Sequence, residues 1–123
     1  MKKWLLSIVF FLYAGSSYAY SAEYMTCMSA AKSEMSEKMS CVKAEQKAQN
    51  KALRKYFKLY KAELPIENQK VLEQTFKIWQ KESRVTCSHL LGNEKTMLQQ
   101  FSSAECFLGM TFHKTNEYKR NVK

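Results

Sequence analysis

The sequence predicts an all-α protein, a compact helical bundle that is built on a long antiparallel helical hairpin and cross-linked by two disulfides. First, the only proline, Pro65, divides a stretch from Glu37 to Cys87 that contains no glycine. Second, apolar residues recur on both sides of Pro65 at helical spacing, without the alternation that is typical of strands. Third, an even number of cysteines, four, follows an N-terminal segment with the features of an export signal.

Residues 1–19 have the pattern of a secretory signal peptide. Lys2 and Lys3 form a basic start, residues 4–13 are largely apolar, and Ser17-Tyr18-Ala19 places small residues at both positions that a signal peptidase recognises. The apolar run is shorter than the roughly 20 residues of a membrane-spanning helix. We therefore expect cleavage after Ala19, with an uncleaved N-terminal anchor as the alternative, and a single domain over residues 20–123. The export signal and the paired cysteines together indicate the bacterial periplasm or secretion.

Two helices are expected before Pro65. Ser21 can cap a short helix from Ala22 to about Lys32, and a second helix should run from about Ser36 to Glu63. The apolar positions of the second helix form two adjacent stripes, which are wide enough to contact two neighbouring helices. One stripe contains Val42, Ala48, Ala52, Tyr56 and Leu59, and the other contains Leu53, Phe57, Tyr60 and Leu64.

A third helix should begin at the proline. Pro65 suits the first helical position, and the helix should stop at Gly92-Asn93. Glu73 and Lys77 have the spacing and orientation of a stabilising ion pair. Two apolar stripes follow the helical period, Leu72, Phe76 and Trp79 in one and Val71, Ile78 and Val85 in the other. Because Trp79 shares a stripe with Leu72 and Phe76, we expect it to be a buried core residue. The alternative is that Trp79 is an exposed anchor for a binding partner.

The C-terminal segment predicts a last helix. Residues 94–101 carry no decisive pattern, and we expect them to be partly helical. Ser102-Ser103-Ala104-Glu105 has the sequence of a capping box, so the last helix should run from about Ser103 to Lys119. Its inward positions should be Ala104, Leu108, Phe112 and Thr115, with Phe107 alongside.

The four cysteines admit three pairings. We favour the local pairing, Cys27 with Cys41 and Cys87 with Cys106, in which each bridge ties a flanking segment to one end of the hairpin. An antiparallel hairpin would also place Cys41 level with Cys87, and this alternative joins Cys27 to Cys106. Closing a loop of either local length is worth about 3 kcal/mol in the chain-entropy model.

The expected mature chain is strongly basic. Without Lys2 and Lys3 it has 18 basic and 11 acidic residues, a formal net charge of +7, and none of its acidic residues is Asp. Such a charge favours anionic partners, namely nucleic acid, membrane surfaces, phosphate-rich envelope polymers or acidic proteins. A lysine surface that only keeps the protein soluble is the alternative.

Two charged groups on the predicted hairpin are candidates for partner binding. Lysines four residues apart on one helix face repel each other by a few tenths of a kcal/mol per pair, so a ridge of them suits electrostatic docking. An acidic pair flanks the Pro65 turn, which is the exposed tip of the hairpin. The candidates are Lys43, Lys47, Lys51 and Lys55 on the ridge and Glu63 and Glu67 at the tip.

The sequence lacks the motifs of catalysis and metal binding. Without Asp, it cannot form an Asp-containing catalytic triad or an Asp-based metal cluster. It contains no His-Glu-x-x-His helix, glycine-rich phosphate loop or nucleophile elbow. A zinc site made of Cys87, His89, Cys106 and His113 would have a ligand spacing unlike the usual one. We therefore predict a non-enzymatic protein with no catalytic residue, metal or cofactor.

One set of residues and spacings is shared with a known family. It consists of Cys27, the segment Glu37-Lys-Met-Ser-Cys41, Tyr56, Leu72, Trp79, Cys87, Cys106 and Thr111. In these residues the chain resembles the LprI-type lysozyme-inhibitor domain family of small secreted bacterial proteins, over roughly residues 27–118. The resemblance implies a compact helical fold in which Glu37, Tyr56, Leu72, Trp79 and Thr111 are structural positions.

The resemblance also implies a function. An LprI-like protein would be exported and would inhibit a lysozyme-type cell-wall hydrolase without being an enzyme itself. Because a charge of +7 opposes binding to a basic lysozyme, an acidic or neutral hydrolase suits this chain better. The alternative is a basic envelope adaptor whose lysine ridge binds an anionic polymer or an acidic protein. Neither function predicts a small-molecule cofactor or stable membrane insertion after signal cleavage.

Overall fold

The fold is known from a computed structural model that describes residues 20–93 and 95–123, so the predicted signal peptide, residues 1–19, lies outside the described part. Within that part the backbone contains helices and no strand, which confirms the predicted all-α class. The elements are α2 (Ala22–Ala31), α3 (Met35–Ala62), α4 (Ile66–Ser88), the short 3₁₀ helix η1 (His89–Leu91) and α5 (Met97–Asn121).

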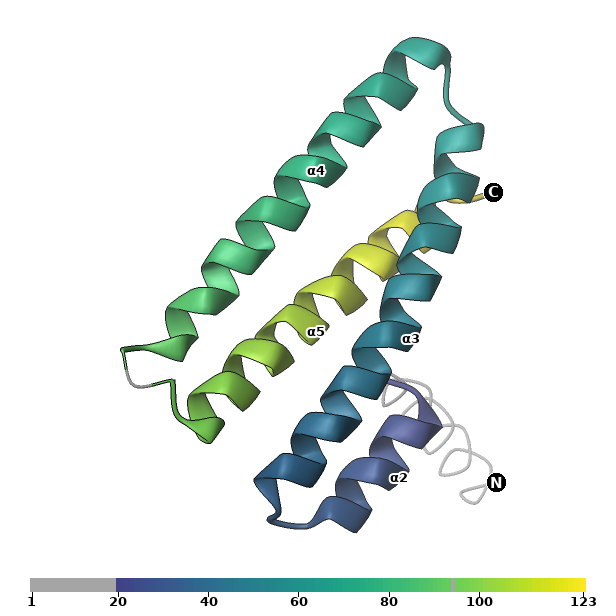
Figure 1. Ribbon diagram of the computed structural model, residues 1–123. Coiled ribbons are helices and arrows are strands. Elements are labelled where there is room, and N and C mark those ends of the chain that lie inside the picture. The colour runs from purple at the N-terminus through teal and green to yellow at the C-terminus, as the bar shows by residue number, and fades with distance from the viewer. Residues whose placement is uncertain (1–19, 94) are drawn as a thin grey trace, which may run out of the picture.

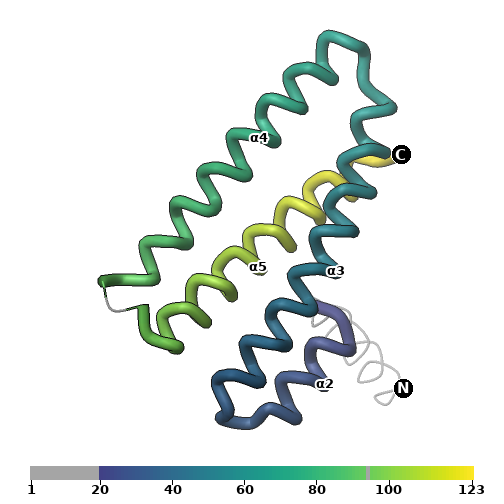
Figure 2. Tube along the Cα trace, viewed as in Figure 1, coloured from purple at the N-terminus to yellow at the C-terminus, as the bar shows by residue number. Residues whose placement is uncertain are grey.

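The long hairpin is formed by α3 and α4, which are joined at the Pro65 turn (Figure 1). The last helix, α5, runs between these two helices, and α2 packs beside the first half of α3 (Figure 2). The most extensive interface is the one between α3 and α5. Direct contact between α3 and α4 is limited, and it includes the stacked rings of Phe57 and Phe76, whose centroids are 4.6 Å apart.

Two apolar clusters lie at opposite ends of α3. The first joins α2, α3 and α5 around Val42 and Leu108, which are fully buried. The second lies nearer the turn and joins α3, α4 and α5 around Leu53, Leu72 and Tyr118. The two apolar stripes predicted on the second helix, α3, therefore contact two neighbouring helices, and the contact with α5 is much larger than the contact with α4.

The start of α2 agrees with the prediction and ties this helix to α3. The Ser21 hydroxyl caps the helix by accepting a hydrogen bond from the Tyr24 backbone N–H at 3.1 Å. The same hydroxyl and the Ser21 backbone N–H each donate to the buried Glu45 carboxylate at 2.7 Å. Gln49 Nε2 donates to Glu45 as well, at 3.3 Å. Glu45 therefore lies inside the α2–α3 interface and away from the lysines on the outer face of α3.

Two helix boundaries differ from the prediction. The first is the start of α4, where Pro65 is the N-cap residue and not the first helical residue. The stop at Gly92 agrees with the prediction, because η1 ends at Leu91 and Gly92 has a positive φ of 62°. The predicted start of the last helix near Ser103 is wrong, because α5 begins at Met97. Thr96 and Gln99 form the true capping box, in which Thr96 Oγ1 accepts from the Gln99 N–H at 3.2 Å and Gln99 Oε1 accepts from the Thr96 N–H at 2.9 Å.

Both local disulfides are present. Cys27 bonds to Cys41 and Cys87 bonds to Cys106, with Cα–Cα distances of 5.7 and 5.6 Å. The first bridge holds α2 against the first part of α3, and the second holds the end of α4 against the first half of α5. The predicted local pairing is therefore confirmed.

The expected ion pair between Glu73 and Lys77 does not form. Glu73 instead pairs with Lys61 across the hairpin, close to the turn. The hydrogen bond and positive charge of Lys61 hold the pKa of Glu73 below its ordinary value. Glu73 thus pairs with a lysine of α3 and not with one of its own helix. The spacing of residues within α4 could not predict this pair.

Candidate partner-binding surface

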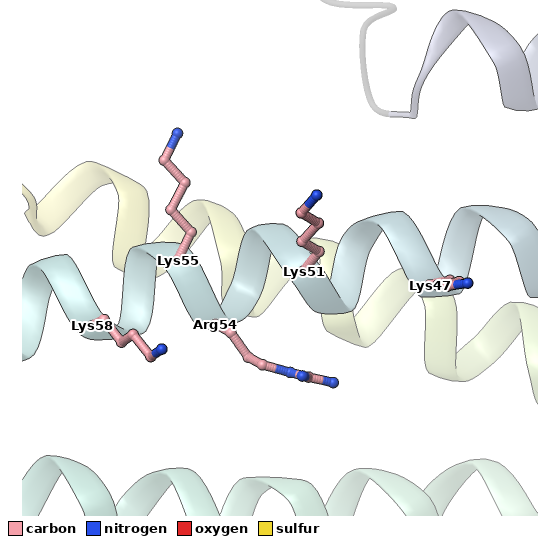
Figure 3. Close-up of a pocket in the computed structure, with 5 residues that line it drawn as sticks. All are labelled: Lys47, Lys51, Arg54, Lys55 and Lys58. Carbon is pink, nitrogen blue, oxygen red and sulfur yellow. The ribbon is translucent and has the colours of Figure 1, made fainter.

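A densely basic surface lies on the exposed side of α3. Five cationic side chains line a hollow of about 460 Å³, and we call them the basic ridge: Lys47, Lys51, Arg54, Lys55 and Lys58 (Figure 3). Lys43 is exposed too, but it does not line the hollow. The structure thus groups three of the four predicted lysines with Arg54 and Lys58, whose helical spacing from Lys47 and Lys51 was visible in the sequence.

No acid neutralises the basic ridge within residues 20–93 and 95–123. The ion pairs found there are Lys61 with Glu73 and Lys114 with Glu117, and neither involves a ridge residue. Repulsion among the ridge cations is therefore relieved only by solvent and dissolved ions, or by a bound anion. Such a surface attracts an anionic partner over about 8–10 Å at moderate salt.

The acidic tip is smaller than the sequence predicted. The Glu63 carboxylate accepts hydrogen bonds from the Lys123 backbone N–H, at 3.0 and 3.3 Å to its two oxygens. Glu63 therefore fastens the C-terminal end of the chain near the turn. Glu67 is exposed in the first turn of α4, where the helix dipole favours an acid.

An apolar stripe remains uncovered along α4. The exposed fractions of Val71, Ile78 and Val85 are 58%, 54% and 51%. These residues were predicted to form the second stripe of the helix, and the structure places them on its outer side, away from α5. Lys70 and Lys77 are exposed beside them. Seven-residue spacing places the three residues on one side of α4, about 10 Å apart along its axis, with polar residues between them.

The described residues hold no cluster with the chemistry of a metal site. Among the described residues, no group of three or more His, Cys, Asp or Glu side chains could hold a metal ion. His89 and His113 are exposed, and both cysteines of the imagined zinc site are in a disulfide. The helices that the structure describes also include none long and apolar enough to cross a membrane.

Comparison with known proteins settles the family. The family model described as "Lysozyme inhibitor LprI" matches residues 27–118, from the first disulfide cysteine to the buried Tyr118. The chain belongs to the LprI family. No curated protein and no solved structure matches it. The family description names an inhibitor of lysozyme and not an enzyme.

The residues that carry the LprI pattern have unequal surroundings. Leu72 and Thr111 are buried, and Tyr56 is half-buried beneath Lys55 and Lys119, whose ammonium nitrogens lie 5.4 and 5.7 Å from the centre of its ring. Glu37 is exposed in the first turn of α3, where the helix dipole stabilises a negative charge. Leu72 and Thr111 are therefore covered by the fold, whereas Glu37 and part of Tyr56 are accessible to a partner.

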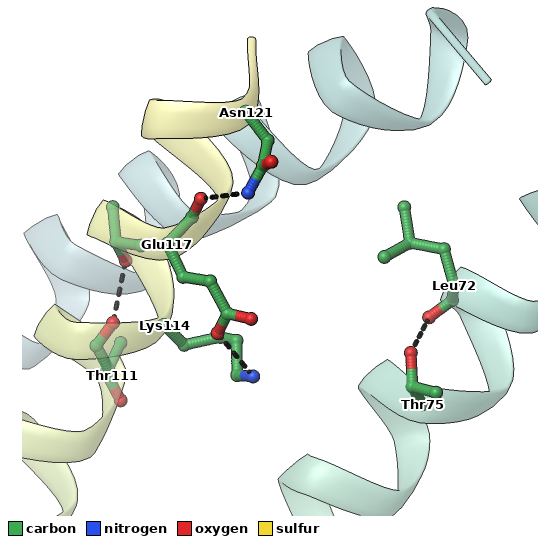
Figure 4. A network of polar contacts seen from close by, with 7 residues as sticks. Leu72, Thr75, Thr111, Lys114, Glu117 and Asn121 are labelled. Atoms are coloured by element: carbon green, nitrogen blue, oxygen red, sulfur yellow. Dashed lines mark hydrogen bonds and ion pairs between the residues drawn. The ribbon is translucent and has the colours of Figure 1, made fainter.

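Trp79 is half-buried. It was predicted to be a buried core residue, and only part of its side chain is covered. Its ring stacks on Phe76 and Phe107, with centroid distances of 5.9 and 6.5 Å. Lys114 Nζ lies 5.8 Å from the centre of the Trp79 ring and pairs with Glu117 at 2.7 Å (Figure 4). One side of the indole is therefore packed, while another side borders open space.

A buried polar link joins α3 to α5 at the LprI position Thr111. Thr111 Oγ1 donates to the Phe107 carbonyl at 2.8 Å and accepts from Gln46 Nε2 at 2.9 Å. Gln46 Nε2 also donates to Asn50 Oδ1 at 2.8 Å, and Gln46 Oε1 is buried without a partner among the described residues. This link fixes the register of α3 against α5, because the hydrogen bond forms only when Gln46 and Thr111 lie opposite each other.

Proposed function

We propose that this LprI-family protein is exported and inhibits a lysozyme-type cell-wall hydrolase by direct protein contact. The observation that carries the proposal is the family match over residues 27–118. Export is supported by the signal-peptide pattern in residues 1–19 and by the two disulfides, which persist in oxidising compartments. The periplasm or the surrounding medium is where a cell-wall hydrolase would be met.

The basic ridge is our candidate for the contact surface. A protein interface gains association rate and specificity when charges of opposite sign face each other across it. Five exposed cations without an acidic partner would therefore meet an acidic surface best. We propose that the target hydrolase is acidic or carries an acidic patch, since a strongly basic one would be repelled by the ridge and by the net charge.

The test is a lysis assay with residues 20–123 of the protein. The fall in turbidity of a cell-wall suspension is followed for several lysozyme-type hydrolases that differ in net charge, with and without the protein. We expect inhibition that is strongest for an acidic hydrolase. Reversing three ridge charges, Lys47→Glu, Lys51→Glu and Lys55→Glu, should weaken that inhibition by about tenfold or more.

A matched control changes the same number of charges elsewhere. Lys70, Lys77 and Lys81 are exposed on α4 and lie outside the basic ridge, so their change to Glu should preserve most of the inhibition. Failure to inhibit any hydrolase would refute the proposed function. Equal losses in the two triple variants would refute the role of the ridge and leave only an effect of net charge.

The second candidate function is binding of an anionic envelope polymer, and the unpaired cations of the ridge favour it. Polymer binding would weaken steeply between low and moderate salt because bound counterions are released. A shape-driven protein interface would weaken much less. Titration with a soluble polyphosphate at two salt concentrations, with the two triple variants beside the natural chain, therefore separates the candidates.

A further inference from the structure

A second cleft, which shares Arg54 with the basic ridge, opens beside the half-buried Trp79. Its volume is about 260 Å³, and it lies where α3, α4 and α5 meet. All three helices contribute to its wall, and no acidic residue lines it. The residues that give the cleft its chemistry are Asn50 and Arg54 from α3, Trp79, Gln80 and Arg84 from α4, and Phe107 from α5.

The apolar part of the cleft is aromatic. The Trp79 ring makes interplanar angles of 20° with Phe76 and 26° with Phe107, and all three rings line the cleft. The face of an aromatic ring carries partial negative charge and attracts the slightly positive C–H groups of a flat or chair-shaped ring. This wall is suited to a ring-shaped ligand.

Two arginines supply positive charge from opposite helices. Arg54 projects from α3 toward α4 (Figure 3), and Arg84 lies on α4 itself. Both are exposed, and neither has an ion pair or a hydrogen bond to the rest of the described chain. A guanidinium group binds a carboxylate through two parallel hydrogen bonds, which makes arginine the side chain best suited to this anion.

Two amides complete the wall with donors and acceptors. Asn50 Oδ1 already accepts from Gln46 Nε2, which leaves the Asn50 amide hydrogens for a ligand. The side chain of Gln80 makes no hydrogen bond within the described residues, so it offers both an acceptor and donors. Amides of this kind suit the hydroxyl groups of a sugar, which also donate and accept.

We propose that this cleft binds a sugar acid, a single six-membered sugar ring that carries a carboxylate. The ring would lie against Trp79, the carboxylate would pair with Arg54 and Arg84, and the hydroxyl groups would meet Asn50 and Gln80. A volume of 260 Å³ corresponds to about nine water molecules at roughly 30 Å³ each, which is room for one such ring. Arg54 also belongs to the basic ridge, whereas the other residues of the cleft do not, so the proposal concerns a different ligand at a site that adjoins the ridge.

The binding test uses a natural probe inside the cleft. The chain has two tryptophans, Trp4 and Trp79, so a protein of residues 20–123 has Trp79 as its only one. Its fluorescence is followed during titration with glucuronate, with glucose, which lacks the carboxylate, and with benzoate, which lacks the hydroxyls. We expect a saturable change with glucuronate and affinities about tenfold or more weaker for the other two, because each loses one kind of polar contact.

Charge-matched variants assign the binding to the cleft. Arg54→Gln with Arg84→Gln should weaken glucuronate binding by about tenfold or more, since charged hydrogen bonds are the strongest contacts proposed. Lys47→Gln with Lys51→Gln removes the same charge outside the cleft and should change the affinity less than about twofold. All four side chains are exposed, so both variants are expected to fold, which circular dichroism checks.

Three results would overturn the proposal. They are the absence of any saturable change with glucuronate, an equal response to glucose, and an equal loss of affinity in the lysine variant. A glucuronate-terminated oligosaccharide, titrated in parallel, tells whether the ring is accepted at the end of a glycan or only as the free sugar. The lysis assay above changes Lys47, Lys51 and Lys55, none of which lines the cleft, so the failure of either proposal is distinguishable from the failure of the other.

Discussion

Changing Thr111 to Val should destabilise the protein by removing a buried contact between α3 and α5. Valine has nearly the same shape as threonine, so the change removes the hydroxyl and little packing. The change removes the acceptor of the Gln46 N–H, which donates to Thr111 Oγ1 at 2.9 Å. The oxygen of the same amide, Gln46 Oε1, is buried and has no hydrogen-bond partner among the described residues. Leaving one buried donor unpaired costs about 1–3 kcal/mol. For a domain of this length that corresponds to a fall in Tm of about 4–8 °C per kcal/mol.

Urea unfolding followed by circular dichroism measures this loss, and a double-mutant cycle assigns it. Gln46→Leu removes the amide, so the combined Gln46→Leu and Thr111→Val protein should be more stable than the sum of the two single changes implies, by about 1 kcal/mol. Thr115→Val is the matched control, because Thr115 is buried and its hydroxyl donates only to the Thr111 carbonyl within α5. An additive cycle, or an equal loss in the Thr115 variant, would refute the account of this link.

Three further predictions test the core, the ionisation and the surface of the protein. Leu108→Ala should lower the free energy of unfolding by about 2–5 kcal/mol in urea, because Leu108 is fully buried, and a loss below 1 kcal/mol would contradict the assigned cluster. Burial raises the pKa of Tyr118 to about 12, above its ordinary value of 10.0, so the phenol should ionise first in the unfolded chain and stability should fall as pH rises from 10 to 12; absorbance titration showing ordinary ionisation of every tyrosine would exclude this. Sedimentation should find a monomer at low salt, because the net charge and the lysines at Lys70 and Lys77 oppose pairing of two α4 stripes, and a dimer would show that apolar contact outweighs their repulsion.

The helices and the disulfides could be predicted because their signals are local in the sequence. The apolar period, Ser21 as a cap and the separation of Cys27 from Cys41 are each properties of one segment. The start of α5 was missed because two segments have capping-box spacing, and only one of them lies at a helix end. Phe101 packs against the first apolar cluster, which favours continuous helix through the second candidate, Ser102-Ser103-Ala104-Glu105.

For the candidate surfaces, too, local features could be predicted from the sequence and contacts between distant segments could not. Four-residue spacing on one helix was enough to predict exposed lysines such as Lys47, whereas the partner of Glu73 on the other arm of the hairpin was not predictable. The cleft between Arg54 and Arg84 was missed for the same reason. It exists because α5 separates α3 from α4, and that separation depends on packing between distant segments.

The order of the cysteines along the chain has a consequence for how the molecule is made. Each cysteine bonds to its nearest cysteine neighbour in sequence, Cys27 to Cys41 and Cys87 to Cys106. A chain that enters an oxidising compartment N-terminus first would present its thiols in the order in which they are to be joined. The first pair could close before Cys87 emerged, so oxidation in order of arrival gives the native bridges without a disulfide isomerase.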